Sequence, residues 1–247
     1  MMILVTRPSP AGEQLVKQLI ALGMDACHTP LISFAKGSEL DRLPEFLRQL
    51  GNSGLLIAAS QHAVDYAQKE LEEQNIPWPS GIAYLAIGQK TASALEEASG
   101  FSVHSPEGRE ISEQMLKLPQ LQRVAGKDIV ILRGNGGRNL LAKTLTERGA
   151  RVRFCECYQR VPIAYDGDTL CESWQLAQVN TLVVTSGEML QQIYDLTPGR
   201  HRHWLLNLSL LVVSERLAEQ AAVLGWSRCR VADNADNGAL IRALQSF

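Results

Sequence analysis

The sequence lacks an excess of charge of either sign. Its 247 residues include 24 Lys and Arg against 26 Asp and Glu, which gives a formal net charge of −2. Proteins that bind nucleic acid over a broad surface usually carry a clear excess of positive charge. The balance therefore argues against a nucleic-acid partner, and it means that an anionic ligand must be held by local groups.

Cysteine shows no pairing pattern, and long apolar runs are missing. The cysteines are odd in number and have neither disulfide-scaffold nor zinc-site spacing, as expected of reduced thiols in the cytoplasm: Cys27, Cys155, Cys157, Cys171 and Cys229. No apolar stretch approaches the ~20 residues that a membrane span needs, and the first residues have the pattern of a strand, not of a signal peptide. We therefore expect a cytoplasmic protein without a membrane partner.

The sequence also lacks the motifs of metal, cofactor and covalent chemistry. It contains no HExxH, no nucleophile elbow and no GxGxxG or P-loop spacing. Gly134–Gly137 is better interpreted as a tight strand-to-helix turn than as a nucleotide loop, and His201–His203 as a solvated loop. Cys155 and Cys157 fit a metal or redox pair or, more simply, packing residues on one face of a strand. We predict no metal and no cofactor, so an enzyme of this kind would act by positioning and hydrogen bonds.

What the sequence does contain is a repeat. Lys127–Arg160 has the pattern of a βαβ unit, with an apolar β-branched run, a glycine turn, a segment of period 3.6 and a second strand. The same pattern opens the chain 126 residues earlier, where Ile3–Arg7 aligns with Ile129–Arg133. There the extended segment His28–Phe34 takes the place of the second strand. A chain that repeats itself in this way contains two copies of one fold.

Further strands alternate with helices in both copies. The apolar run Leu55–Ser60 corresponds to Leu182–Ser186, and Tyr84–Ile87 corresponds to Leu210–Val213. Continuous apolar strands separated by helices indicate parallel sheets that are buried on both faces. The predicted fold class is therefore α/β, with two similar parallel-sheet domains that are pseudo-duplicated at a shift of 126 residues.

Periodicity leaves two assemblies of these copies open. In the first, residues 1–125 and 127–247 form separate domains. In the second, the opening βαβ unit is exchanged, which gives a discontinuous domain, a middle domain and an interdomain two-stranded β ladder: 1–28 with 162–247, 38–152, and 29–37 with 153–161. The extended character of both bridging segments favours the second assembly.

Candidate ligand-binding residues follow from the strand ends. In open parallel sheets, ligands bind outside the carboxyl ends of the strands, where helix N-termini favour anions. The turns at these ends are rich in small residues and hydroxyls, and two such rims facing each other would line an anion-binding cleft between the domains. They contribute these candidates: Arg7, Ser60, Gln61, Gly88, Thr91, Asn135, Gly136, Gly137, Ser186 and Ser214.

Tyr158 is the candidate for chemistry. It lies in the second strand of the Lys127–Arg160 unit, where its phenol could donate a proton to a leaving hydroxyl or orient an anion. Tyrosines are common on strands, so an aromatic side chain that packs the hinge is the simpler interpretation of the residue by itself.

The order and spacing of several motifs, taken together, resemble the uroporphyrinogen-III synthase family nearly end to end, and most closely its enterobacterial members. The motifs are Thr6–Pro8, Ser60, Ala86–Ala92, Leu132–Arg138, Cys157–Arg160 and Val184–Gly187. The resemblance implies the exchanged two-domain fold. It also implies a lyase of heme and porphyrin biosynthesis that needs no cofactor. This enzyme converts hydroxymethylbilane to uroporphyrinogen III in the interdomain cleft, with loss of water and inversion of ring D.

The resemblance also implies roles for single residues. Tyr158 matches the tyrosine that assists departure of the hydroxyl, and Ser60, Thr91 and Ser186 match hydroxyls that bind the acetate and propionate groups carried by every ring of the substrate. Arg7 matches an arginine that is either structural or substrate-binding. Relatives often have threonine where Leu217 stands, so no hydroxyl is expected there. We expect a monomer acting on this small molecule; the alternative is a non-catalytic two-domain binder of an anionic small molecule, which would close on its ligand without turnover.

Overall fold

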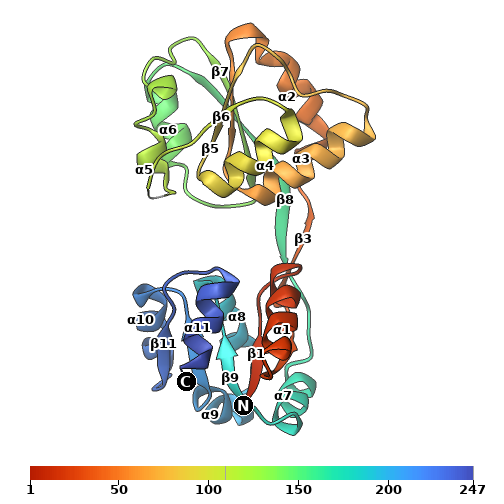
Figure 1. The fold of residues 1–247 in the computed structure, drawn as a ribbon, viewed down its shortest axis with the longest axis vertical. Helices are drawn as coiled ribbons and strands as arrows, with labels where there is room; N and C mark the ends of the chain where they lie inside the picture. Colours follow the sequence, from red (N-terminus) through yellow and green to blue (C-terminus); the bar gives the residue numbers. More distant parts are fainter. Residues whose placement is uncertain (109, 247) are drawn as a thin grey trace. The chain divides into compact units, whose positions relative to one another are not determined.

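The chain divides into two compact units (Figure 1). The structure, a computed structural model, describes residues 1–108 and 110–246. Unit 1 contains Met1–Ser33 and the residues from Val161 onward, and unit 2 contains Phe34–Arg160. The chain passes from one unit to the other along two hydrogen-bonded neighbouring strands, β3 (Ile32–Lys36) and β8 (Arg151–Pro162).

Unit 2 is built on a six-stranded sheet with the strand order β3-β8-β7-β4-β5-β6. The strands from β8 through β7, β4 and β5 to β6 all pair in parallel. The remaining strands are β4 (Leu55–Ala58), β5 (Ala83–Ala86), β6 (Val103–His104) and β7 (Asp128–Gly134). The helices are α2 (Leu43–Gln49), α3 (Gln61–Glu73), α4 (Gln89–Ser99), α5 (Ser112–Met115) and α6 (Leu140–Glu147), with short 3₁₀ turns at η1 (Leu40–Arg42), η2 (Gly51–Ser53) and η3 (Pro119–Leu121).

Both faces of the unit 2 sheet are buried because alternate strand residues point to opposite sides. Leu56 and Ala58 of β4 pack with α2, α3 and α4, whereas Leu55 and Ile57 pack with α5 and α6. All four of these strand residues are at most 1% exposed. A continuous apolar run is what a parallel strand covered by helices on both faces requires, so the strand predicted from Leu55 onward is confirmed.

Unit 1 repeats this architecture with a five-stranded sheet in the order β11-β10-β9-β1-β2. Its strands are β1 (Met2–Val5), β2 (Asp25–His28), β9 (Val179–Val183), β10 (Ser209–Val212) and β11 (Cys229–Val231), all in parallel pairings. The helices are α1 (Ala11–Ala21), α7 (Gly167–Leu176), α8 (Gly187–Leu196), α9 (Gly199–Leu206), α10 (Glu215–Leu224) and α11 (Asn237–Gln245). Residues of α7 to α10 pack against one face of the sheet, and those of α1 and α11 against the other.

The duplication is visible element by element. The helices α3 and α8 begin 126 residues apart, as do α4 and α10, and the strand pairs β1 and β7, β5 and β10, and β6 and β11 keep the same offset. The two sheets therefore present equivalent strand-to-helix turns, which is the pattern that the repeat predicted.

The predicted continuous segment His28–Phe34 is wrong in its bounds. β2 ends at His28, and β3 begins only at Ile32. Pro30 lies in the gap, and proline has no N–H with which to continue a ladder. The equivalent strand β8 contains no proline before its last residue and runs unbroken for 12 residues.

The predicted loop at His201–His203 is also wrong, because these residues lie in α9. The helix buries Leu205, and the side chain of His201, only 12% exposed, lies 3.0 Å from the amide of Gln175. The polar composition of the segment hides this packing. The last helix, α11, begins with a side-chain cap, since Asp236 accepts a hydrogen bond from the Ala239 N–H at 2.8 Å.

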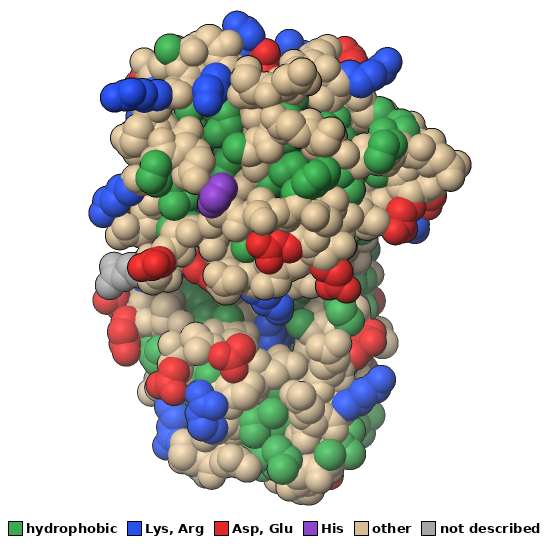
Figure 2. Space-filling view, turned by 45° about the horizontal axis from the view of Figure 1, so that its top comes forward, with side chains coloured by type: hydrophobic (Ala, Val, Ile, Leu, Met, Phe, Trp, Pro, Cys, Tyr) green, Lys and Arg blue, Asp and Glu red, His purple; other side chains and the backbone are tan. Residues whose placement is uncertain are grey.

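Basic and acidic side chains both occur on the face of each unit that Figure 2 shows, as the near-zero net charge predicts. Within residues 1–108 and 110–246, no helix has the length and apolar character needed to cross a membrane.

Candidate functional site

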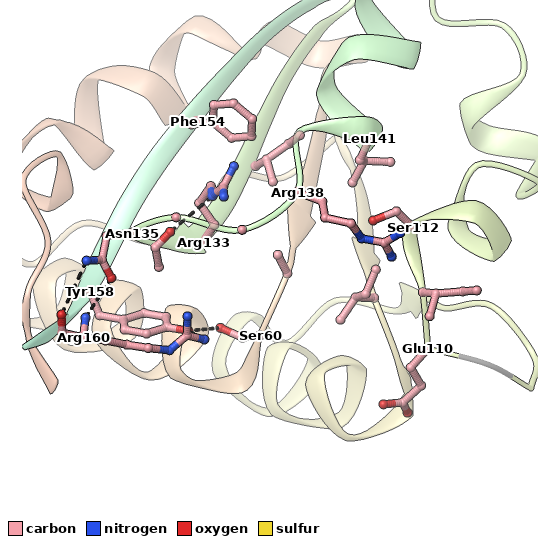
Figure 3. Close-up of a pocket in the computed structure, with 17 residues that line it drawn as sticks. Ser60, Glu110, Ser112, Arg133, Asn135, Arg138, Leu141, Phe154, Tyr158 and Arg160 are labelled. Carbon is pink, nitrogen blue, oxygen red and sulfur yellow. Dashed lines mark hydrogen bonds between the residues drawn. The ribbon is translucent and has the colours of Figure 1, made fainter. Parts of the chain in front are cut away.

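A pocket of about 250 Å³ opens at the carboxyl ends of β4, β5, β7 and β8 in unit 2 (Figure 3). Its walls come from the turns after these strands and from the segment before α5. The lining residues with polar side chains or glycine are Ser60, Glu110, Ser112, Arg133, Gly134, Asn135, Gly136, Gly137, Arg138, Tyr158 and Arg160. Pockets for drug-sized ligands usually measure about 300–1,000 Å³, so this one accommodates a part of such a molecule.

Tyr158 lies in this pocket because of an irregularity in β8. The pairing of β7 with β8 shifts after Arg133, which faces Glu156, so that Gly134 faces Tyr158 and Cys157 is an extra residue. In a regular strand Cys157 and Tyr158 would point to opposite faces, but both belong to the same core cluster here. The bulge therefore turns the phenol ring inward, and Tyr158 is only 2% exposed.

Gly134 makes room for that ring. A Cβ atom at this position would lie 2.5 Å from the Tyr158 Cζ, which is closer than real Cβ contacts allow. On its other sides the ring contacts Phe34, His62 and Tyr66, with centroid distances of 5.5, 5.7 and 6.0 Å. The phenol is thus fixed by packing before any ligand enters.

The hydroxyl of Tyr158 accepts hydrogen bonds from two side chains. The Ser60 hydroxyl donates to it at 3.2 Å, while the Ser60 Oγ itself accepts from the Ala63 N–H at 3.2 Å as the N-cap of α3. The Arg160 guanidinium donates through Nη2 at 3.5 Å (Figure 3). A phenol oxygen that accepts in this way keeps its own proton for a further partner, so it can act as a proton donor.

The turn after β7 holds the end of β8. The Asn135 N–H donates to the Tyr158 carbonyl at 3.0 Å, and the Asn135 Oδ1 accepts from the Arg160 N–H at 2.7 Å. Gly136 and Gly137 have φ values of 75° and 96°, which favour glycine. The turn after β7 is therefore hydrogen-bonded to β8 through Asn135. The predicted strand-to-helix turn at Gly134–Gly137 agrees with this geometry.

Arginine residues give the pocket a positive lining. Arg133 lies over the Phe154 ring, 4.4 Å from its centroid, and donates to the Gly134 carbonyl and the Asn139 side chain. Arg138 pairs with Glu113 at 2.6 Å, and this hydrogen bond lowers the pKa of the glutamate carboxyl. A lining of this kind suits a ligand with carboxylate groups.

His62 lies beside the phenol without adding charge. Partial burial lowers the pKa of His62; Asp65 opposes this shift, and Arg160 and Lys90 reinforce it. The imidazole is therefore predominantly neutral near pH 7. Phe34 packs on it with a centroid distance of 4.2 Å, so the ring acts as a wall of the Tyr158 enclosure.

The helix α4 begins beside the pocket with a carboxylate at its N-terminus. Glu110 accepts from the Gln89 N–H at 2.9 Å, close to Gly88, whose missing side chain leaves the space for it. Gly88 is the N-cap of α4, and Thr91 is buried in its first turn. Gln61 is the first residue of α3. These candidates stand near Ser60 at neighbouring strand ends, but Gln61, Gly88 and Thr91 are not among the pocket's lining residues.

The remaining candidates are at the equivalent strand ends of unit 1. Ser186 caps α8 by accepting from the Met189 N–H at 3.2 Å, and Ser214 caps α10 by accepting from the Leu217 N–H at 3.4 Å. Arg7 follows β1 and donates to the side chain of Asn237; burial lowers the pKa of its guanidinium, and Asp236 acts in the opposite direction. Leu217 is 2% exposed and belongs to the core.

Cys155 and Cys157 are packing residues in the structure, each fully buried, with their sulfur atoms 3.7 Å apart. The hydrogen bond with Cys155 and burial both raise the pKa of the Cys157 thiol. In the described part of the chain, no three His, Cys, Asp or Glu side chains are grouped as a metal site would require.

Sequence reasoning missed several residues of the pocket, namely Glu110, Ser112, Arg133, Arg138 and Arg160. Arg160 could have been found from its place two residues after Tyr158 on the same strand, since such residues share a face. Glu110 carried no usable signal, because its partner in α4, Gln89, lies 21 residues away in the sequence.

The double role of Ser60 leads to a prediction. Ser60→Ala removes the N-cap of α3 and one donor to the phenol, so we expect the free energy of unfolding to fall by about 1 kcal/mol and the kcat of the cyclisation that the resemblance implies to fall roughly 5-fold. Urea unfolding and steady-state turnover measure the two effects.

Asp166→Ala is the matched control, because Asp166 caps α7 in unit 1 by accepting from the Thr169 N–H at 2.8 Å. It should lose comparable stability and keep its turnover. If Ser60→Ala and Asp166→Ala have the same kcat, the Ser60 hydroxyl serves the helix alone.

Comparison with known proteins gives one family. The family model described as uroporphyrinogen-III synthase HemD matches residues 13–242. The chain is 57% identical to the uroporphyrinogen-III synthase of Escherichia coli (strain K12) over 246 residues, which cover 99% of this chain and 100% of that protein. It is 56% identical to the enzyme of the same name from Salmonella typhimurium, with the same coverage.

Solved structures agree on the fold. A mutant uroporphyrinogen III synthase from the extremely thermophilic bacterium Thermus thermophilus matches with a TM-score of 0.66 at 20% identity, covering both chains completely. The uroporphyrinogen-III synthetase of Helicobacter pylori 26695 matches with a TM-score of 0.59 at 19% identity, over 100% of this chain and 99% of that one. Family model, full-length relatives and fold agree, and the chain belongs to the uroporphyrinogen-III synthase family.

Proposed function

We propose that this protein is a uroporphyrinogen-III synthase, a lyase that cyclises hydroxymethylbilane to uroporphyrinogen III with loss of water and inversion of ring D. The observation that carries the proposal is the 57% identity to an enzyme of that name over its entire length. The pocket of unit 2 supports it, since a phenol that can donate a proton stands beside arginine side chains.

The chemistry begins with the hydroxyl of the substrate. The Tyr158 phenol donates its proton to this oxygen as the C–O bond breaks, so water leaves and the pyrrole nitrogen, which keeps its proton, supplies the electrons that form an azafulvenium cation. The methylene carbon of this cation then bonds to ring D at its substituted α-carbon, which gives a spiro intermediate. The older bond from that α-carbon to the methylene next to ring C breaks, and this methylene bonds to the free α-carbon of ring D, which inverts the ring. The free α-carbon loses its proton in this last step, and the proton restores the phenol.

Two arginines of the pocket, Arg133 and Arg138, are proposed to bind the carboxylates of one end of the substrate. The contacts described for Arg133 and Arg138 use two of the five N–H donors of each guanidinium, and the others can serve a ligand. A 250 Å³ pocket is below the usual range for a whole ligand and suits one ring of a linear tetrapyrrole.

The other strand-end residues are proposed to bind further carboxylates. In unit 2 these are Gln61, Gly88 and Thr91, and in unit 1 they are Ser186, Ser214 and Arg7. The N-termini of α3, α8 and α10 favour anions through the helix dipole and the N–H groups of the first turn, whereas at α4 the Glu110 carboxylate already accepts from the Gln89 N–H. The backbone carries this role at α10, where Leu217 supplies no hydroxyl.

The decisive experiment supplies hydroxymethylbilane and separates the type I and type III isomers of the product after oxidation to porphyrins. We expect predominantly type III. Exclusive formation of the uninverted type I isomer, which arises spontaneously, would overturn the proposal.

We also propose that the protein acts as a cytoplasmic monomer and needs no cofactor, with no nucleic-acid or membrane partner. Its net charge of −2 and its unpaired cysteine pattern support this setting. Light scattering should give the mass of one chain, and activity should survive dialysis against EDTA.

A further inference from the structure

The Arg160 side chain lines the pocket but has no role so far. It belongs to the motif Cys157–Arg160, but neither this motif nor the proposed reaction gives it a function. It is an exposed residue near the end of β8, and its backbone is fixed on both sides by Asn135, whose Oδ1 accepts from the Arg160 N–H at 2.7 Å and whose Nδ2 lies 3.5 Å from the Arg160 carbonyl. Because the backbone of Arg160 is fixed in this way, fewer positions are open to its guanidinium.

The guanidinium is directed at Tyr158. Residues two apart in a strand share a face, and Arg160 Cζ lies 5.8 Å from the centroid of the Tyr158 ring. Arg160 Nη2 lies 3.5 Å from the phenol oxygen (Figure 3). The bond is long, so its contribution depends on charge more than on an ideal geometry.

Hydrogen-bond chemistry limits what this contact can do. Arginine has donors and no acceptor, so the phenol oxygen must accept from it. The Ser60 hydroxyl also donates to that oxygen, while its own oxygen accepts from the N–H of Ala63. With donors on both sides, the phenol proton is left to point into the pocket, where the leaving hydroxyl of the substrate would stand.

The charge acts later in the reaction. When the phenol gives up its proton, negative charge develops on its oxygen, and a cation at 3.5 Å in a partly buried site stabilises that charge. The neighbouring His62 does not compete, because partial burial keeps its imidazole neutral near pH 7.

We infer that Arg160 is a positioning residue of the reaction, which acts through Tyr158 by aiming the phenol proton at the leaving group and stabilising the phenolate that results. This inference rests on the proposed cyclisation. It is distinct from direct binding of a substrate carboxylate, which would make Arg160 independent of Tyr158.

A double-mutant cycle tests it. We expect Arg160→Gln to lower kcat roughly 10-fold with little change of KM, because the interaction strengthens only as charge develops. In the Tyr158→Phe background, the same substitution should change kcat less than about 2-fold, since its target is already gone. Arg160→Lys keeps the charge and should recover most of the lost turnover.

Arg153→Gln is the matched control. Arg153 is an exposed arginine of the same strand that does not line the pocket, and its loss should leave both constants near those of the wild type. Thermal unfolding of each variant confirms that the fold is retained.

Three results would overturn the inference while the wild-type chain still forms type III product. These are an unchanged kcat in Arg160→Gln, a loss that is mainly in KM and equally large in the Tyr158→Phe background, and a lysine variant no better than glutamine. A wild-type chain that yields only type I product would instead overturn the proposed function and this inference together.

Discussion

Tyr158→Phe should lower kcat by about 100-fold and leave KM nearly unchanged. The reason is that proton donation by a positioned side chain contributes in the transition state and not to ground-state binding. The ring itself should stay in place, because Phe34, His62 and Tyr66 enclose it and phenylalanine has the same shape. Steady-state kinetics with hydroxymethylbilane measure kcat and KM.

The isomer ratio adds a second readout. Spontaneous closure to type I competes with the enzyme, so the slower variant should give a larger share of type I product at equal protein concentration. Tyr66→Phe is the control, since Tyr66 stacks on Tyr158 but does not line the pocket. A Tyr158→Phe variant as fast as Tyr66→Phe would reduce Tyr158 to an aromatic that packs the strand.

Gly134→Ala is expected to damage both the fold and the reaction. The added Cβ would lie 2.5 Å from Cζ, 2.7 Å from Cε2 and 2.9 Å from the hydroxyl oxygen of Tyr158. The enclosed ring cannot swing aside, so the strain must be taken up by the β7–β8 bulge. We expect the free energy of unfolding to fall by about 1–3 kcal/mol, and kcat to fall roughly 10-fold as the phenol leaves its donors.

Denaturant unfolding and turnover measure these two losses. Gly199→Ala is the matched control, because a Cβ at the start of α9 would meet no atom within 4 Å. It should change the free energy of unfolding by less than about 1 kcal/mol and leave turnover intact. Wild-type stability and turnover in Gly134→Ala would show that the ring has room that the structure does not give it.

Much of the fold could be predicted because its signals are local. The apolar side chains from Leu55 onward are enough to predict a strand that is buried on both faces. The repeat then predicts the first residue of its counterpart β9 to within a few residues. Capping residues such as Ser60, Ser186 and Asp236 mark helix starts through their own chemistry. These features depend on neighbours in sequence, so one chain suffices to find them.

The features that the sequence hid depend on partners far away in the chain. The change of pairing register between β7 and β8, which turns Tyr158 inward, depends on both strands. The sequence of β8 alone does not indicate it. The helix at His201 is recognisable only once Leu205 has a core to enter.

In the candidate site, too, some residues could be predicted from local sequence and others depend on contacts that are distant in sequence. The rule of carboxyl strand ends finds Ser60, Asn135, Gly136 and Gly137, and these do line a pocket with Tyr158. Arginine is common on protein surfaces, so Arg133 and Arg138 become significant only when the pocket brings them together, whereas the spacing of two residues could have placed Arg160 beside Tyr158.

The place of β1 in its sheet has a consequence for the newly made chain. β1 lies between β2 and β9, and Met2 pairs with Val179, which the ribosome adds 177 residues later. At about 5–20 residues per second, the first strand waits roughly 9–35 s for this neighbour. Unit 2, from Phe34 to Arg160, is complete before that. We therefore expect the inserted unit to fold first during translation, while the amino-terminal strand remains a substrate for chaperones until the last third of the protein emerges.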